Sequence, residues 1–184
     1  MTVRPDSARG RTQRREKRNE LLCQRERCRM SRTAGNVTGR VAATVAYSVL
    51  FAFLLSFSWE VLQTPFYDDA TNDVNVVVWY RVHCALGDIG ILLGSMALGS
   101  GIRRSIRWVL SPSRQDLLLV TSFGVAYTIF SEYVNVRIIE RWSYSPLMPT
   151  AAGIGLVPIA QWLLLPAVIL KLAATHMRGM TSRP

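Results

Sequence analysis

Residues 41–59 read VAATVAYSVLFAFLLSFSW, a run of nineteen residues without a charged side chain. An α-helix rises about 1.5 Å per residue, so a run of this length crosses most of the roughly 30 Å hydrocarbon core of a bilayer. The run ends in the bulky sequence FSWEVLQ, which has no small-residue cleavage site of the kind that follows a signal peptide. We therefore predict a transmembrane helix that remains in the mature protein.

Three further apolar stretches have the length of a membrane span, at residues 82–102, 117–136 and 151–170. The last of these is uncharged and contains Pro158 and Pro166, which membrane helices tolerate where neighbouring groups satisfy the freed carbonyls. With the first span at residues 41–60, the predicted fold class is all-α: a polytopic membrane protein with a four-transmembrane-helix bundle over residues 41–175. Residues 176–184 are predicted to be a short cytoplasmic tail.

The first forty residues carry 12 of the 22 Lys and Arg residues and 4 of the 12 acidic residues, a net charge of +8. An arm that binds nucleic acid usually carries aromatic side chains that stack on bases, and this stretch has none. We interpret residues 1–40 as a basic, disordered cytoplasmic arm that is attracted to anionic lipid headgroups and not to nucleic acid. Met30 is an alternative start that would remove most of the arm.

Sequence motifs add little to this interpretation. Cys23, Cys28 and Cys84 have neither the spacing of zinc ligands nor that of a disulfide framework. There is no nucleotide-binding glycine loop, no histidine-rich metal set and no nucleophile elbow. We expect no cofactor and no metal, and no resemblance to a known family carries functional residues over to this chain.

The distribution of basic residues predicts the orientation, because Lys and Arg accumulate on the cytoplasmic side of short loops. The loop between spans one and two has three acids and no base, and it is expected to lie outside. Basic residues follow span two and span four at Arg103, Arg104, Arg107, Arg114, Lys171, Arg178 and Arg183. An even number of spans puts these segments and the arm on one side. We therefore predict a multi-pass protein of the inner (cytoplasmic) membrane with both termini in the cytoplasm.

Span two is rich in small residues, and Gly90 and Gly94 have the spacing that allows two helices to approach closely. We expect this face to pack within one bundle. A homo-oligomer formed through span two is the alternative. Gly153 and Gly155 are expected to play the same packing role in span four.

The ionisable side chains inside the spans fall in the predicted outer half of the membrane. Each costs about 2.5 to 3.5 kcal/mol at a helix centre, so a cluster of them calls for a reason. Asp88 is expected roughly 10 Å beneath the outer boundary and is the deepest of them. The predicted catalytic residues are Asp88, Glu132, His83 and Glu60. The predicted binding residues are Asn135, Gln63, Trp142 and Tyr144.

Two interpretations of this polar layer remain open. Three acids in one layer repel one another if all are ionised, so Asp88 or Glu132 is expected to carry or share a proton and, near His83, to act as a general acid or base. The alternative is structural, with Arg81 or Arg137 paired to Asp88, Glu132 or Glu140, and with Asn135 and Gln161 hydrogen-bonded across helices. Residues 141–149, which follow span three, are predicted to fold over the bundle mouth as a lid or as an interfacial anchor.

Three functions fit these features. The first is acid/base chemistry on, or binding of, a lipophilic small molecule, and it would place an open pocket at the depth of Asp88. The second is a subunit that transports a proton, a cation or a small solute, which would need a polar route through the inner half of the bundle. The third is a non-catalytic assembly or regulatory subunit, in which the polar layer is fully paired inside the fold.

Overall fold

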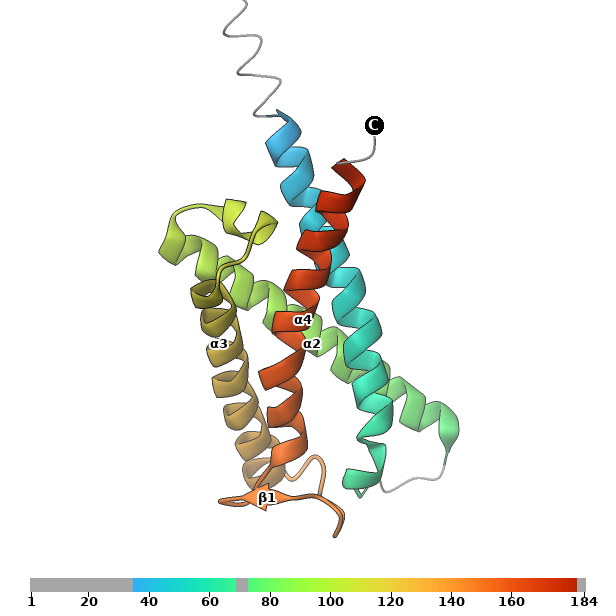
Figure 1. The fold of residues 1–184 in the computed structure, drawn as a ribbon. Coiled ribbons are helices and arrows are strands. Elements are labelled where there is room, and N and C mark those ends of the chain that lie inside the picture. Colours follow the sequence, from blue (N-terminus) through green and yellow to red (C-terminus); the bar gives the residue numbers. More distant parts are fainter. Residues whose placement is uncertain (1–34, 69–72, 182–184) are drawn as a thin grey trace, which may run out of the picture. The chain divides into compact units, whose positions relative to one another are not determined.

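The computed structural model describes residues 35–68 and 73–181. The chain divides into two units, one ending at Arg40 and the other, Val41–Pro184, holding the helices that pack together. Most of the predicted disordered arm, with Met30, Cys23 and Cys28, lies outside the described residues, as do Asp69 and Arg183. Figure 1 shows the helices of the second unit.

Within the described residues, the fold is built almost entirely from helices, and four of them are long and apolar enough to cross a membrane. They are the first helix (Gly35–Leu62), α2 (Val74–Arg103), α3 (Arg114–Tyr133) and α4 (Leu156–Thr181). A π-helical turn, η3 (Val134–Ile138), continues α3. Two short 3-10 helices, η1 (Thr64–Phe66) and η2 (Ile106–Leu110), lie in the loops after the first helix and after α2.

Local capping explains why two helices begin earlier than predicted. The Asp73 carboxylate accepts a hydrogen bond from the backbone N–H of Asn75, so α2 starts at Val74 and not near residue 82. Ser113 and Asp116 form a reciprocal capping box, which starts α3 at Arg114. At about 1.5 Å per residue, α2 is roughly 45 Å long, and it runs obliquely to α3 and α4 (Figure 1).

The start of α4 is later than predicted. Thr150–Ala151 (β1) and Ile154–Gly155 (β2) pair as a small antiparallel hairpin, and the helix begins only at Leu156. The turn between the strands holds Gly153 at φ 77°, a left-handed conformation that glycine adopts at little cost. Gly153 and Gly155 therefore shape this hairpin, and the expectation that they pack helices within span four is wrong.

Helices α3 and α4 approach each other closely at Gly124. A Cβ atom at this position would overlap the indole ring of Trp162, which is buried. The expectation that span two is the glycine-packed helix holds for Gly99, which lies against Trp108, but it is wrong for the glycines that face open space. These are Gly87, Gly90, Gly94 and Gly101. Self-association through this open face stays a prediction.

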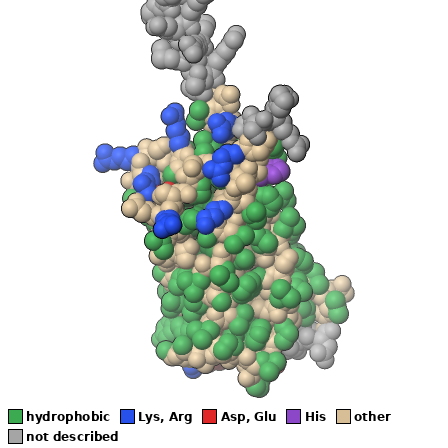
Figure 2. Space-filling view, viewed as in Figure 1, with side chains coloured by type: hydrophobic (Ala, Val, Ile, Leu, Met, Phe, Trp, Pro, Cys, Tyr) green, Lys and Arg blue, Asp and Glu red, His purple; other side chains and the backbone are tan. Residues whose placement is uncertain are grey.

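Large apolar side chains cover the outside of the bundle, and at most 39% of the apolar window of each long helix is buried. Examples on the four helices are Leu50, Leu54, Leu86, Leu98, Leu118, Phe130, Leu163 and Leu164. Figure 2 shows that hydrophobic side chains cover most of one face, whereas Lys and Arg gather at the end where α2 finishes and α4 ends. We call this the basic end. The opposite end holds the β-hairpin and η1.

Candidate functional site

At the opposite end of the bundle, Glu132 accepts hydrogen bonds from two tyrosines. The Tyr144 hydroxyl donates to one carboxylate oxygen at 2.5 Å, and the Tyr67 hydroxyl approaches the other at 3.4 Å. The Tyr144 oxygen also accepts the backbone N–H of Gly155 at 2.9 Å. Glu132 is buried on the last turn of α3, so its carboxylate joins that helix to two loops and to the β-hairpin.

The same two loops are also joined through their backbones. Tyr67 and Tyr144 form an antiparallel bridge, and their rings lie 5.8 Å apart. The N–H of Asp68 donates to the carbonyl of Ser143, and the N–H of Ser145 donates to the carbonyl of Phe66. These bonds hold the 141–149 segment against the segment that follows the first helix. Tyr144 also ties the segment to Glu132, and the role of the segment as a lid or an interfacial anchor stays a prediction.

Burial sets the protonation of the two tyrosines. Burial raises the pKa of the Tyr67 hydroxyl, and the neighbouring Glu132 carboxylate raises it further. Burial also raises the pKa of Tyr144, and the hydrogen bond to Glu132 adds to that effect. Both hydroxyls thus remain protonated well beyond neutral pH, which keeps them as donors to Glu132.

Glu60 and Arg81 form a second buried pair. The guanidinium of Arg81 lies 3.9 Å from the carboxylate of Glu60, and each side chain is 6% exposed. Arg81 also lies 5.8 Å from the centre of the Tyr67 ring, a cation–π distance that links this pair to the tyrosines. The charges of Asp88 and Glu132 also act on Glu60, so the three predicted acids lie within electrostatic range of one another.

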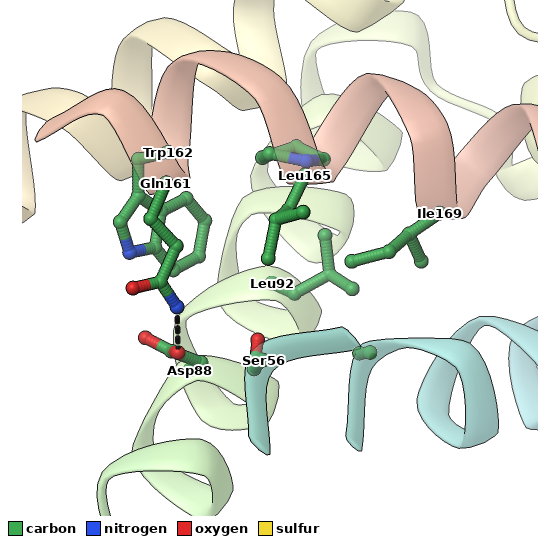
Figure 3. A pocket seen from close by; sticks show the side chains of 9 residues that line it. Ser56, Asp88, Leu92, Gln161, Trp162, Leu165 and Ile169 are labelled. Carbon is green, nitrogen blue, oxygen red and sulfur yellow. Dashed lines mark hydrogen bonds between the residues drawn. The ribbon is translucent and has the colours of Figure 1, made fainter. Parts of the chain in front are cut away.

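Asp88 lies at the middle of α2, apart from the tyrosines. Its carboxylate accepts a hydrogen bond from the side-chain amide of Gln161 on α4 at 2.5 Å (Figure 3). The two residues sit at one end of a partly open groove between the first helix, α2 and α4. Its other lining residues are mostly apolar: Ala52, Ser56, Leu92, Trp162, Leu165, Pro166 and Ile169.

The groove is small. Its free space is about 10 Å³, which admits about one water molecule or one small functional group. Past Asp88 the wall is formed by Leu92, Leu165 and Ile169, which offer no hydrogen bond. The groove therefore combines one carboxylate with an apolar wall.

Other predicted site residues lie elsewhere. His83 is exposed on α2, so the geometry does not bring it to the acids. The side-chain amide of Asn135 donates to the carbonyl and hydroxyl of Ser131 within its own helix, where it supports the start of η3. Gln63 is buried one turn after Glu60, and Trp142 is half-buried in the covering segment. The catalytic and binding roles assigned to these residues stay predictions.

Sequence reasoning missed two members of this region. Tyr67 follows a predicted span, a position where aromatic residues commonly lie at the membrane interface, so its sequence position does not indicate contact with Glu132. Trp162 lies in the second turn of α4, and nothing in its sequence spacing indicates that it lines a groove and fills the space over Gly124. Among residues 35–68 and 73–181, no three His, Cys, Asp or Glu side chains are placed to hold a metal ion.

The arrangement has two chemically different parts. Glu132 is engaged by two tyrosine hydroxyls that belong to loops, whereas Glu60 lies 3.9 Å from Arg81 and joins the first helix to α2. Asp88 faces a groove and is held by neutral donors only, the Gln161 amide together with the side chains of Ser56 and Trp162, so no cation neutralises its charge. The sequence matches no protein-family model, and no curated protein and no solved structure resembles it significantly.

Proposed function

We propose that this chain is an integral membrane protein that binds a lipophilic small molecule at the Asp88 groove. The observation that carries the proposal is a single carboxylate on the wall of a mostly apolar, partly open groove. Ligand sites commonly combine apolar walls with a few placed polar groups. An ionisable side chain at the middle of an apolar helix is costly, which favours a functional reason for it.

Insertion is supported by the outer surface. Four long helices present apolar side chains outward, on a scale that soluble monomers rarely expose. Orientation is supported by the basic end, because Lys and Arg accumulate on the cytoplasmic side. We place the basic end and both termini in the cytoplasm, and the tyrosine-bearing loops outside. Reporter domains fused to the C-terminus and inserted between residues 68 and 73 should report opposite compartments; the same compartment for both would refute this topology.

The size of the groove restricts the ligand. About 10 Å³ accommodates a hydroxyl or an amino group but not the body of a lipophilic molecule. A ligand would therefore place a small donor group against Asp88 and leave its apolar part along the helices, in the lipid. A carboxylate accepts hydrogen bonds, so the fitting class is an amphiphile with a hydroxyl or amine head. Proton transfer between this head and Asp88 is the chemistry that such a contact permits.

The two other functions have weaker support. A transport subunit needs a polar route, and the groove continues from Asp88 into apolar residues. An assembly subunit requires a fully paired polar layer, whereas Glu60 Oε2 and Gln63 Oε1 are buried and accept no hydrogen bond within the described residues. We therefore assign the loops and their acids to structure, and the groove to ligand binding.

A comparison of head groups tests the proposal. In lipid nanodiscs, dodecylamine and dodecanol should raise the unfolding temperature of the protein, whereas dodecyl methyl ether, which has no donor, should not. Asp88→Asn should abolish the greater stabilisation by dodecylamine than by dodecyl methyl ether. Asp68→Asn, which changes an exposed carboxyl, should leave it intact. Equal effects of the three amphiphiles, or an unchanged preference in Asp88→Asn, would refute the assignment.

A further inference from the structure

The loop at the basic end carries four arginines that differ in their partners. Arg103 forms a 2.8 Å ion pair with Asp116, so its charge is used to join the end of α2 to the start of α3. Arg104, Arg107 and Arg114 are exposed, and none of them forms an ion pair with a described residue. We call these three the loop arginines. Their charges remain available to a ligand.

The backbone that carries the loop arginines is held at several points. Arg104 sits in the left-handed conformation that ends α2, with φ 50°, and its N–H donates to the carbonyl of Gly101. The Ser105 hydroxyl oxygen accepts the N–H of Arg107 at 3.2 Å. Arg114 directly follows Ser113, the N-cap of α3. The three guanidinium groups therefore extend from a defined backbone.

Exposed apolar side chains next to the loop arginines indicate where this loop lies relative to the membrane. Ile102 and Ile106 are 61% and 45% exposed beside the arginines. Trp108 lies against Gly99, and its indole N–H donates to the hydroxyl of Ser100 at 3.1 Å. A segment that exposes isoleucine and arginine together fits the boundary between hydrocarbon and headgroups, where tryptophan is also enriched.

We propose that the loop arginines bind the phosphate headgroup of an anionic phospholipid. Guanidinium groups pair with phosphate through parallel hydrogen bonds, and the exposed isoleucines would contact the start of the acyl chains. Attraction to an anionic leaflet strengthens binding about fivefold for each basic residue near the surface. The site would thus enrich anionic lipid at the cytoplasmic end, independently of the Asp88 groove. The inference rests on the insertion and orientation proposed above.

Quenching of Trp108 tests this site locally in the full-length protein. Vesicles of phosphatidylcholine would contain a small fraction of either brominated phosphatidylglycerol or brominated phosphatidylcholine. The fluorescence of Trp108 is obtained by subtracting the emission of the Trp108→Phe variant from that of the unsubstituted protein. We expect several-fold stronger quenching by the brominated anionic lipid. Added inorganic phosphate should not reduce it, because soluble phosphate has no acyl chains to contact the isoleucines.

Substitutions separate this site from the basic N-terminal arm. Replacing the three loop arginines with glutamine should bring the two quenchers to equal strength. Arg141→Gln, which removes an exposed arginine at the opposite end, should leave the anionic preference unchanged. Retained preference in the triple variant, or displacement by inorganic phosphate, would overturn the proposal. Equal quenching by both lipids in the unsubstituted protein would refute the headgroup site alone, whereas quenching by neither would refute insertion.

Discussion

Deleting the hydroxyl of Tyr144 should destabilise the bundle far more than deleting that of Tyr67. Both Tyr→Phe substitutions remove the same atom, so the comparison is matched. The hydroxyl of Tyr144 has two partners, since it donates to Glu132 at 2.5 Å and accepts the N–H of Gly155 at 2.9 Å. The hydroxyl of Tyr67 makes one long contact with Glu132, at 3.4 Å.

The expected magnitudes follow from these partners. A hydrogen bond to a charged group contributes about 1.5 to 3 kcal/mol, and a buried donor left without its partner costs about 1 to 3 kcal/mol. Because Tyr144 is partly exposed, water can reach some of these groups, and we expect Tyr144→Phe to cost about 2 to 4 kcal/mol. The single long contact of Tyr67 predicts about 0.5 to 1.5 kcal/mol for Tyr67→Phe.

Equilibrium unfolding in mixed micelles measures both free energies. In the background of Glu132→Gln, the cost of Tyr144→Phe should shrink, because the charged acceptor is already gone, and the difference gives the coupling between the two residues. Equal destabilisation by the two tyrosine substitutions would refute the network as described. So would additive effects of Tyr144→Phe and Glu132→Gln.

Three further predictions concern packing, the groove and pH. Gly124→Ala should destabilise the bundle by about 1 to 3 kcal/mol, because the new Cβ overlaps Trp162. Gly94→Ala, whose Cβ would lie in open space, should stabilise it by about 0.5 to 1 kcal/mol. Equal unfolding midpoints of the two variants would contradict the α3–α4 contact. Asp88→Asn should keep the unfolding temperature of the protein, because an amide oxygen can still accept the hydrogen bond from Gln161, but it should lose ligand selectivity. A decrease of about 3 to 5 kcal/mol in the free energy of unfolding would instead indicate a buried ion pair. Folding raises the pKa of Tyr144, so the contribution of this residue to the free energy of unfolding is fully present below the unfolded pKa of about 10 and is lost as the pH rises above it. When stability is measured against alkaline pH, Tyr144→Phe should therefore lose less stability than the unsubstituted protein.

Helical spans could be read directly from the sequence, because a long uncharged run specifies its own local structure. The run at residues 41–59 lies within one helix, and each of the other three predicted spans overlaps a long helix. Helix ends were predicted less well. The caps at Asp73 and Ser113 use short-range polar contacts outside the apolar runs, and a hydropathy pattern does not weigh them.

From the sequence alone, helix length and alternating direction predict Glu60, Asp88 and Glu132 in one half of the bundle. The structure has Glu60 and Glu132 near helix ends and Asp88 at the middle of α2. Tertiary structure decided their partners. Residues 67 and 144 are 77 positions apart, yet they meet and hold Glu132, while Arg81 pairs with Glu60 and Gln161 with Asp88. Such pairings depend on the rotation of each helix about its axis and on how the loops fold back. Those quantities follow from packing such as Trp162 against Gly124, which the periodicity of a single helix does not encode.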